Sequence, residues 1–143
     1  MATLTAANSV IFIAVTGLLT VPQQLQGFDV DDVVSTDPVS NAETRMGVDG
    51  KLSAGWVPME RKQTFSLQAD SASNDLFDTW WSAEQAFREK FRAVGTIQLP
   101  SIGKTYAMIN GVLGQYAPIP GVKKILQARQ WVITWEDIQV APL

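Results

Sequence analysis

Few residues in this chain of 143 have both the type and the spacing that chemistry requires. The densest acidic cluster is formed by Asp29, Asp31 and Asp32 in the stretch DVDD. Carboxylates bind hard cations, but a calcium loop needs further oxygen ligands at regular spacing and a terminal glutamate, which this stretch lacks. The cluster therefore predicts local negative charge and no metal site.

The chain contains no histidine and no cysteine. Their absence excludes Ser-His and Cys-His catalysis, thiolate chemistry and disulfide bonds. The glycine-rich stretch GVDGKLSAG is not a phosphate loop, because Leu52 rather than Ser or Thr follows Lys51. An enzyme that works through carboxylates alone is left as one alternative. No catalytic residue and no cofactor is predicted.

Charge is distributed unevenly along the chain, whose formal net charge is −3. Residues 1–43 contain five acidic residues and no Lys or Arg, so they sum to −5, while the remaining residues sum to +2. These are either scattered solvated side chains, or an acidic face that meets a basic face of another copy. The overall acidity argues against a general nucleic-acid binder, which needs a basic surface.

The apolar run VIFIAV, residues 10–15, raises the question of targeting. It is shorter than the roughly 18 residues that a transmembrane helix requires. No Lys or Arg side chain precedes it, as a secretory leader would need. Its β-branched content predicts a buried strand, so we expect a cytoplasmic protein without membrane insertion.

The chain as a whole is typical of one domain made mainly of strands. Strands are predicted at 9–15, 20–34, 62–69, 94–100, 104–114 and 123–138, with loops at 35–42 and 116–121. A bulge near Asp31 and Asp32 would explain the broken alternation in the second strand. The period of two is clearest at 62–69, where Phe65, Leu67 and Ala69 share a face.

One helix is predicted over residues 73–92, with Ser73 or Asn74 as its cap. Its apolar stripe consists of Leu76, Trp80, Ala83, Phe87 and Phe91. Phe77 and Trp81 fall outside this stripe. They either widen the buried face of the helix or contact a neighbouring subunit.

The last predicted strand has apolar side chains on both faces. Trp131, Ile133 and Trp135 share one face, and Leu126, Ala128 and Val132 share the other. A strand of this kind is covered on both sides, either by the helix or by another subunit. The tryptophans are thus interpreted as core residues or as a platform for a ligand.

The stretch RMGVDGKLSAGWVP, residues 45–58, contains the pair Asp49-Gly50, which is typical of a hairpin turn. The stretch is too long to be only that turn. Arg45 and Lys51 beside Asp49 give it charges of both signs. We therefore expect a projecting hairpin within residues 43–60.

The order of these elements resembles the tail tube proteins of bacteriophages. In that family a Gly-x-Asp-Gly hairpin precedes a strand with a Thr-x-x-Leu-x-Ala-like run, and a Ser/Asn-rich cap leads into a helix with a Phe-Asp-like pair. The matching residues here are Gly47, Asp49 and Gly50; Thr64, Leu67 and Ala69; Ser71, Ser73 and Asn74; and Phe77 and Asp78. The resemblance covers about residues 9–140.

This resemblance implies a single domain over residues 1–143, with a flexible arm at 1–8 and a β-sandwich-like barrel flanked by the helix. Such subunits form hexameric rings that stack into the hollow tube of a virion tail, assembled in the host cytoplasm. Related tubes occur in contractile injection systems. Contractile and non-contractile tails both remain open, and the compact size of the chain favours a contractile one. Expected partners are further copies of the chain and the sheath, baseplate, tape measure and terminator proteins.

The resemblance also assigns roles to residues. Viral DNA would pass through an acidic lumen without specific binding, and we expect Asp29, Asp31 and Asp32 to line it. Residues expected between stacked rings are Arg45, Gly47, Asp49, Gly50, Lys51 and Trp56. Candidates for contact between subunits are Phe77, Trp81, Trp131 and Trp135. The alternative is a monomeric ligand-binding barrel whose pocket is lined by the tryptophans and Tyr106.

Overall fold

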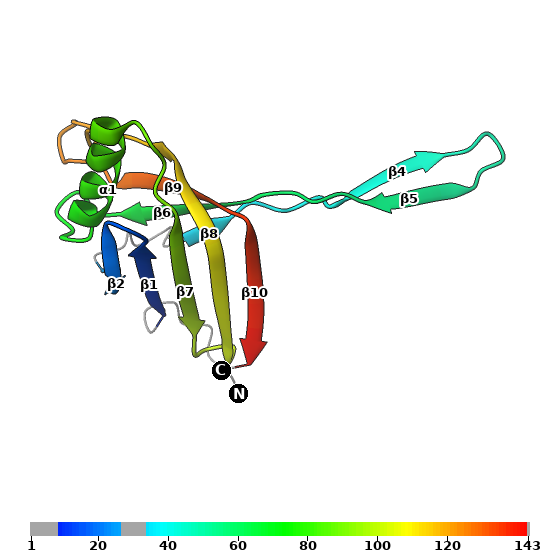
Figure 1. The fold of residues 1–143 in the computed structure, drawn as a ribbon, viewed down its shortest axis with the longest axis horizontal. Helices are drawn as coiled ribbons and strands as arrows, with labels where there is room; N and C mark the ends of the chain where they lie inside the picture. Colours follow the sequence, from blue (N-terminus) through cyan, green and yellow to red (C-terminus); the bar gives the residue numbers. More distant parts are fainter. Residues whose placement is uncertain (1–8, 27–33, 143) are drawn as a thin grey trace.

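The computed structural model describes residues 9–26 and 34–142, and this part of the chain is mainly β with one helix (Figure 1). The elements are, in chain order, β1 (Val10–Val15), β2 (Leu19–Gln24), β3 (Val34–Thr36), β4 (Ala42–Met46), β5 (Leu52–Trp56), β6 (Arg61–Leu67), α1 (Asn74–Phe87), β7 (Ala93–Leu99), β8 (Lys104–Tyr116), β9 (Arg129–Trp135) and β10 (Asp137–Pro142). The predicted fold class is confirmed. The predicted strands at 9–15, 62–69, 94–100 and 104–114 agree with β1, β6, β7 and β8 to within two residues.

The body of the protein consists of two antiparallel sheets that share the long strand β8. The first sheet has the order β2-β1-β7-β8-β10, and the second has the order β8-β9-β6-β3. The first part of β8 pairs with β7 and β10, and its last part pairs with β9. Between these parts Asn110 has a φ of 50°, a left-handed conformation that asparagine tolerates. The strands of the two sheets consequently run in steeply different directions (Figure 1).

The core lies between the two sheets and α1. In the second sheet Phe65 pairs with Trp131, and both are fully buried, as is Trp135. Trp135 occupies the space that two glycines of the first sheet leave open. A Cβ on Gly95 would lie 3.1 Å from Cη2 of Trp135, and one on Gly111 would overlap the same indole ring. The close approach of the sheets therefore depends on glycine at both positions.

The predicted strand over 20–34 is shorter in the structure. β2 ends at Gln24, which pairs with Phe12, and one more backbone hydrogen bond follows, from the amide of Leu25 to the carbonyl of Ile11 at 2.9 Å. Leu25 then turns into the core and is 3% exposed. The predicted bulge at Asp31 and Asp32 lies outside the described residues. The loop predicted at 35–42 is shorter as well, since β3 extends to Thr36.

The single strand predicted over 123–138 was wrong, because this stretch contains a loop and two strands. Its neighbour β6 ends where Leu67 pairs with Arg129, so residues before Arg129 have no strand to pair with. At the other end Trp135 still pairs with β6, but Asp137 already pairs with Ile109 of β8. The chain changes sheets at Glu136, which separates β9 from β10.

The helix is also shorter than the predicted 73–92. It ends at Phe87, and Arg88 takes a left-handed conformation with φ of 56°. Lys90 lies after the end of the helix and folds back onto it, so that its Nζ lies 2.9 Å from Oε2 of Glu84. Ser73 stands at the cap position but makes no side-chain cap bond. The side chain of Asn74 is used elsewhere, in the core.

Candidate assembly surfaces

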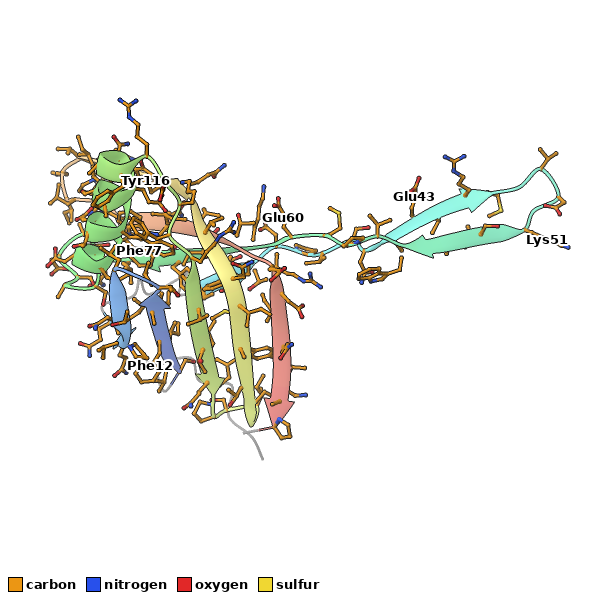
Figure 2. All side chains as sticks on the ribbon, in the orientation of Figure 1. Phe12, Glu43, Lys51, Glu60, Phe77 and Tyr116 are labelled. Atoms are coloured by element: carbon orange, nitrogen blue, oxygen red, sulfur yellow. The ribbon has the colours of Figure 1, made fainter. Side chains whose placement is uncertain are left out.

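A two-stranded arm is the most prominent feature of the surface. β4 and β5 pair only with each other, from Ala42 opposite Trp56 to Met46 opposite Leu52. Figure 1 shows the arm extending far from the body, at the end opposite to α1. In Figure 2, Glu43 and Lys51 lie on this arm, well away from the body. The projecting hairpin expected within 43–60 corresponds to this element.

Four of the expected residues build the tip of the arm. The amide of Gly47 donates to the carbonyl of Lys51 at 2.8 Å, and the amide of Gly50 donates to the carbonyl of Gly47 at 3.0 Å. Oδ1 of Asp49 accepts from the amide of Lys51 at 3.2 Å. Gly50 has a φ of 82°, which favours glycine. These residues therefore have a demonstrable local role, which is to close the hairpin.

The two faces of the arm differ in character. Residues directly opposite each other in a hairpin share a face, so one face carries the pairs Ala42–Trp56, Thr44–Ala54 and Met46–Leu52. Trp56, Met46 and Leu52 are 72%, 66% and 63% exposed. The other face carries Glu43 and Arg45, whose charged groups lie 4.0 Å apart.

This apolar face has no cover within the described part of the chain. An isolated two-stranded hairpin is only marginally stable in water, and a contiguous exposed apolar patch marks an interaction site. Of these three residues, only Trp56 was predicted from the sequence to make a contact, and Met46 and Leu52 were not. The sequence does contain a signal for this face. If the two strands pair on either side of the Asp49-Gly50 turn, Met46 lies opposite Leu52, and Leu52 and Trp56 share a face because they are four residues apart.

Three strands of the body present free edges within the described residues. β2 and β10 are the outer strands of the first sheet, and β3 is the outer strand of the second. Val21 on β2 and Val140 on β10 are 68% and 58% exposed. Unpaired backbone groups at a strand edge are ready to pair with another chain.

Three of the four candidate subunit-contact residues were assigned wrongly. Phe77, Trp131 and Trp135 are fully buried, so their side chains do not reach the surface of the subunit. Nε1 of Trp131 donates to Oδ1 of Asn74 at 3.0 Å, and Nε1 of Trp135 donates to Oε1 of Gln63 at 3.1 Å. Both indoles are thus satisfied within the chain. Phe77 widens the buried face of the helix, which was the alternative interpretation.

Trp81 is the fourth candidate and is half-buried. Its ring stacks on Tyr116 with centroids 5.3 Å apart, and its Nε1 donates to Oδ1 of Asp78 at 3.0 Å. Tyr106 lines a cavity of about 420 Å³ together with Ile11 and Ile138, but no tryptophan lines it. The ligand-binding alternative therefore loses most of its expected aromatic lining.

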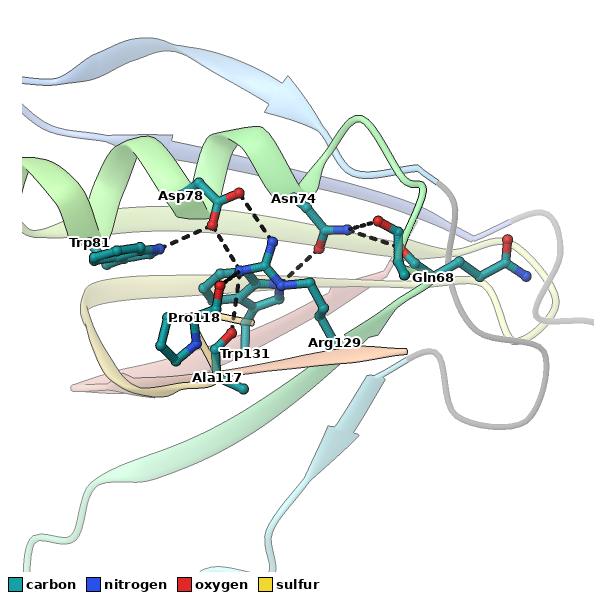
Figure 3. A network of polar contacts seen from close by, with 9 residues as sticks. Gln68, Asn74, Asp78, Trp81, Ala117, Pro118, Arg129 and Trp131 are labelled. Atoms are coloured by element: carbon teal, nitrogen blue, oxygen red, sulfur yellow. Dashed lines mark hydrogen bonds and ion pairs between the residues drawn. The ribbon is translucent and has the colours of Figure 1, made fainter. Parts of the chain in front are cut away.

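A polar network that the sequence did not indicate joins α1, β9 and the segment before β9 (Figure 3). The guanidinium of Arg129 donates to both carboxylate oxygens of Asp78, at 2.8 and 3.1 Å. It also donates to the carbonyls of Ala117 and Pro118, each at 3.3 Å, and lies over the ring of Trp131. The hydrogen bonds from Arg129 lower the pKa of Asp78, against the opposing effect of burial.

The acidic residues expected to line a lumen, Asp29, Asp31 and Asp32, lie outside the described residues. Among the residues that are described, no group of acidic side chains is placed to hold a metal ion. The same part of the chain contains no helix with the length and apolar character needed to cross a membrane.

The family of the protein is established by comparison of its sequence. The family model described as "Tail fiber protein gp32" matches residues 2–139. The chain belongs to this family. This member of the gp32 family is thus a structural component of a tail. The resemblance to tail proteins is confirmed at the level of the family. No curated protein sequence gives a significant match.

Solved structures show the fold that the gp32-family chain shares. It is similar to a chain in the extended sheath/tube terminator of the PVC extracellular contractile injection system, with a TM-score of 0.63, 12% identity, and coverage of 99% of this chain and 98% of that chain. A chain of the anti-feeding prophage baseplate gives a TM-score of 0.61, 10% identity and coverage of 99% and 98%. A chain of the extended PVC sheath-tube complex gives a TM-score of 0.57 and 14% identity, with coverage of 93% of this chain and 88% of that chain. The predicted tail-tube type of fold is confirmed.

Proposed function

We propose that this protein is a ring-forming subunit of a hollow tail tube. The observation that carries the proposal is the arm, whose apolar face of Met46, Leu52 and Trp56 is exposed in the single subunit. Trp56, at the base of the arm, borders a groove with Ile109 and Glu136 of the body, whereas Met46 and Leu52 lie farther out, where only another chain can bury them (Figure 1). The tube-type fold makes further copies of the chain the best-supported partner.

In this proposal two kinds of contact build the assembly. The free edges of β2 and β10 pair between neighbours, so that a closed ring leaves no unpaired edge. Arms then reach the next ring, and such heterologous contacts repeat along an axis. Six subunits per ring are proposed, and the related baseplate structure, which was 6-fold symmetrised, supports this number.

The outer face of the first sheet supports a lumen that passes DNA without holding it. The register places two rows of side chains on the face directed away from the core: Phe12, Thr96, Ala107 and Gln139, and Val10, Gln98, Thr105 and Ala141. Neither row contains Lys or Arg. A surface without basic side chains lacks the main source of affinity for phosphate. We propose that this face lines the tube and that Asp29, Asp31 and Asp32 add negative charge to the lumen.

The proposed setting is a contractile virion tail assembled in the host cytoplasm. Two of the related structures are a sheath-tube complex and a sheath/tube terminator. By analogy we propose that sheath, baseplate, tape measure and terminator proteins contact the rings made by this chain.

The description of the family supports a second candidate, a component of a tail fibre. A fibre subunit is expected to form elongated particles without a central hole. The two functions are therefore separated by the shape of the assembled particle.

Electron microscopy of the purified protein over a range of concentrations tests the proposal. We expect rings with a central hole that stack into tubes as the concentration rises. A variant that lacks residues 46–55 should keep the circular dichroism spectrum of the folded protein and form rings that do not stack. Monomers of 15.6 kDa at every concentration, solid fibres, or normal tubes from the deletion variant would each contradict it.

A further inference from the structure

We propose that the loop of residues 117–128 is the surface that receives the arm of the next copy. This inference rests on the proposed function, because it names the acceptor for the arm in stacking. The loop will be called the acceptor loop.

The acceptor loop exposes apolar side chains to an unusual degree. Ile119, Val122 and Ile125 are 71%, 74% and 77% exposed, and Leu126 is 55% exposed. Connecting segments normally carry polar side chains, and four exposed aliphatic residues within eight positions form a patch rather than scattered exceptions. Such a patch is typical of a surface that another protein covers.

The backbone of the acceptor loop is held in place before any partner arrives. Arg129 donates to the carbonyls of Ala117 and Pro118, and the amide of Gln127 donates to the carbonyl of Gly121 at 2.9 Å. The side chain of Gln127 further donates to the carbonyl of Ile125 at 2.8 Å. A preformed surface loses little conformational entropy on binding, so it is suited to repeated docking.

A groove beside the loop offers space for an inserted segment. It has a volume of about 770 Å³ and lies between Ile125 and Leu126 on one side and the turn of Gln68 and Asp70 on the other. Its lining combines apolar side chains with one carboxylate. The tip of the arm has the matching composition, with the exposed Val48 beside Lys51.

Position and charge favour a second copy as the occupant. The arm and the acceptor loop lie at opposite ends of the longest axis of the molecule (Figure 1), so an arm cannot reach the loop of its own subunit. A contact between two different surfaces of identical chains then continues from copy to copy. Asp70 can face Lys51 of the next copy, and Lys123 and Lys124 can face its Asp49.

Two variants with complementary defects test the inference. The arm variant carries Met46→Lys and Leu52→Glu, an opposite-charge pair that is compatible with the hairpin and removes its apolar face. The loop variant carries Ile119→Asp and Ile125→Asp, which would bury carboxylates in the contact. We expect each variant alone to lose stacking in sedimentation and microscopy. A one-to-one mixture of the two should form pairs of rings, because it contains one intact arm surface and one intact acceptor loop.

A matched control places the same change in another loop. The control variant is Ile102→Asp, in the turn between β7 and β8, where the side chain of Ile102 is 47% exposed. Rings of this variant should stack like those of the wild type. Normal stacking of the loop variant, or a mixture that stays unpaired, would overturn the inference. If the chain forms no rings at all, the proposed function fails. The mixture then still reports on the inference, since an arm–loop contact yields one-to-one dimers.

Discussion

Asp78 on α1 and Arg129 at the start of β9 form a bidentate ion pair. Nη2 of Arg129 lies 2.8 Å from Oδ1 of Asp78, and Nη1 lies 3.1 Å from Oδ2. The two partners differ in burial, because the side chain of Arg129 is 7% exposed and that of Asp78 is 38% exposed. The arginine therefore depends on the aspartate more than the reverse. The pair fixes the helix to the sheet at the point where the acceptor loop joins β9 (Figure 3).

Removal of the aspartate is expected to destabilise the fold. Asp78→Ala leaves a buried guanidinium without its anion, and we expect the free energy of unfolding to fall by about 3 kcal/mol. Urea denaturation followed by circular dichroism measures this change. Asp75→Ala, one turn earlier on the exposed side of α1, serves as control and should cost about 0.5 kcal/mol. Equal losses from both substitutions would contradict the role assigned to the pair.

The stability should also depend on pH in the acid range through the same carboxylate. The pKa of Asp78 is lowered in the folded protein, chiefly by the hydrogen bonds from Arg129. Its contribution is therefore fully present above the unfolded pKa of about 3.9 and is lost as the pH falls through the lower folded pKa. Asp78→Asn should flatten this part of the curve of unfolding free energy against pH. Curves of identical slope below pH of about 4 would exclude the carboxylate as a cause.

Packing between the sheets predicts a sharp difference between two glycines. Gly111→Ala would push a methyl group into the ring of Trp135, whereas a Cβ at Gly55 on the arm meets nothing within 4 Å. We expect Gly111→Ala to lower the free energy of unfolding by about 1–3 kcal/mol. Gly55→Ala should stay within about 0.5 kcal/mol of the wild type. Thermal and urea unfolding of the two variants provide the comparison.

Two phenylalanines of the helix are expected to differ in how much their substitution lowers the free energy of unfolding. Phe77 is fully buried and stacks on Trp131 with centroids 4.9 Å apart, while Phe87 is 69% exposed. Phe77→Ala should therefore cost about 3–5 kcal/mol, and Phe87→Ala less than about 1 kcal/mol. Similar costs in urea denaturation would show that the buried face of α1 has been misplaced.

This contrast also shows what local patterns could predict. The helical period correctly located the helix and the burial of Trp80, but it placed Phe87 in the apolar stripe and left Phe77 outside it. The stripe was also drawn one turn too long, because α1 ends at Phe87 and Phe91 lies beyond it. A helix end set by the left-handed Arg88 has no strong signal in the sequence.

The pairing of the strands could not be predicted from the sequence either. Alternation predicted β6 and the buried face of β9, because side-chain period is a local property. The change of sheets at Glu136 depends on which strands lie beside the chain at that point, which is a property of the folded chain. The arm was predicted because a turn signal is local, and the acceptor loop was missed because its lysines and aliphatic residues imitate a strand.

The separation of the arm from the body affects how substitutions act during the evolution of the protein. Only residues 37–41 and 57–60 connect the two, and the buried core contains no residue of β4 or β5. Substitutions on the arm are therefore expected to leave the folding of the subunit unaffected, even where they weaken the proposed contact between copies. If the arm joins copies as proposed, the strength of that contact can evolve separately from the stability of the subunit.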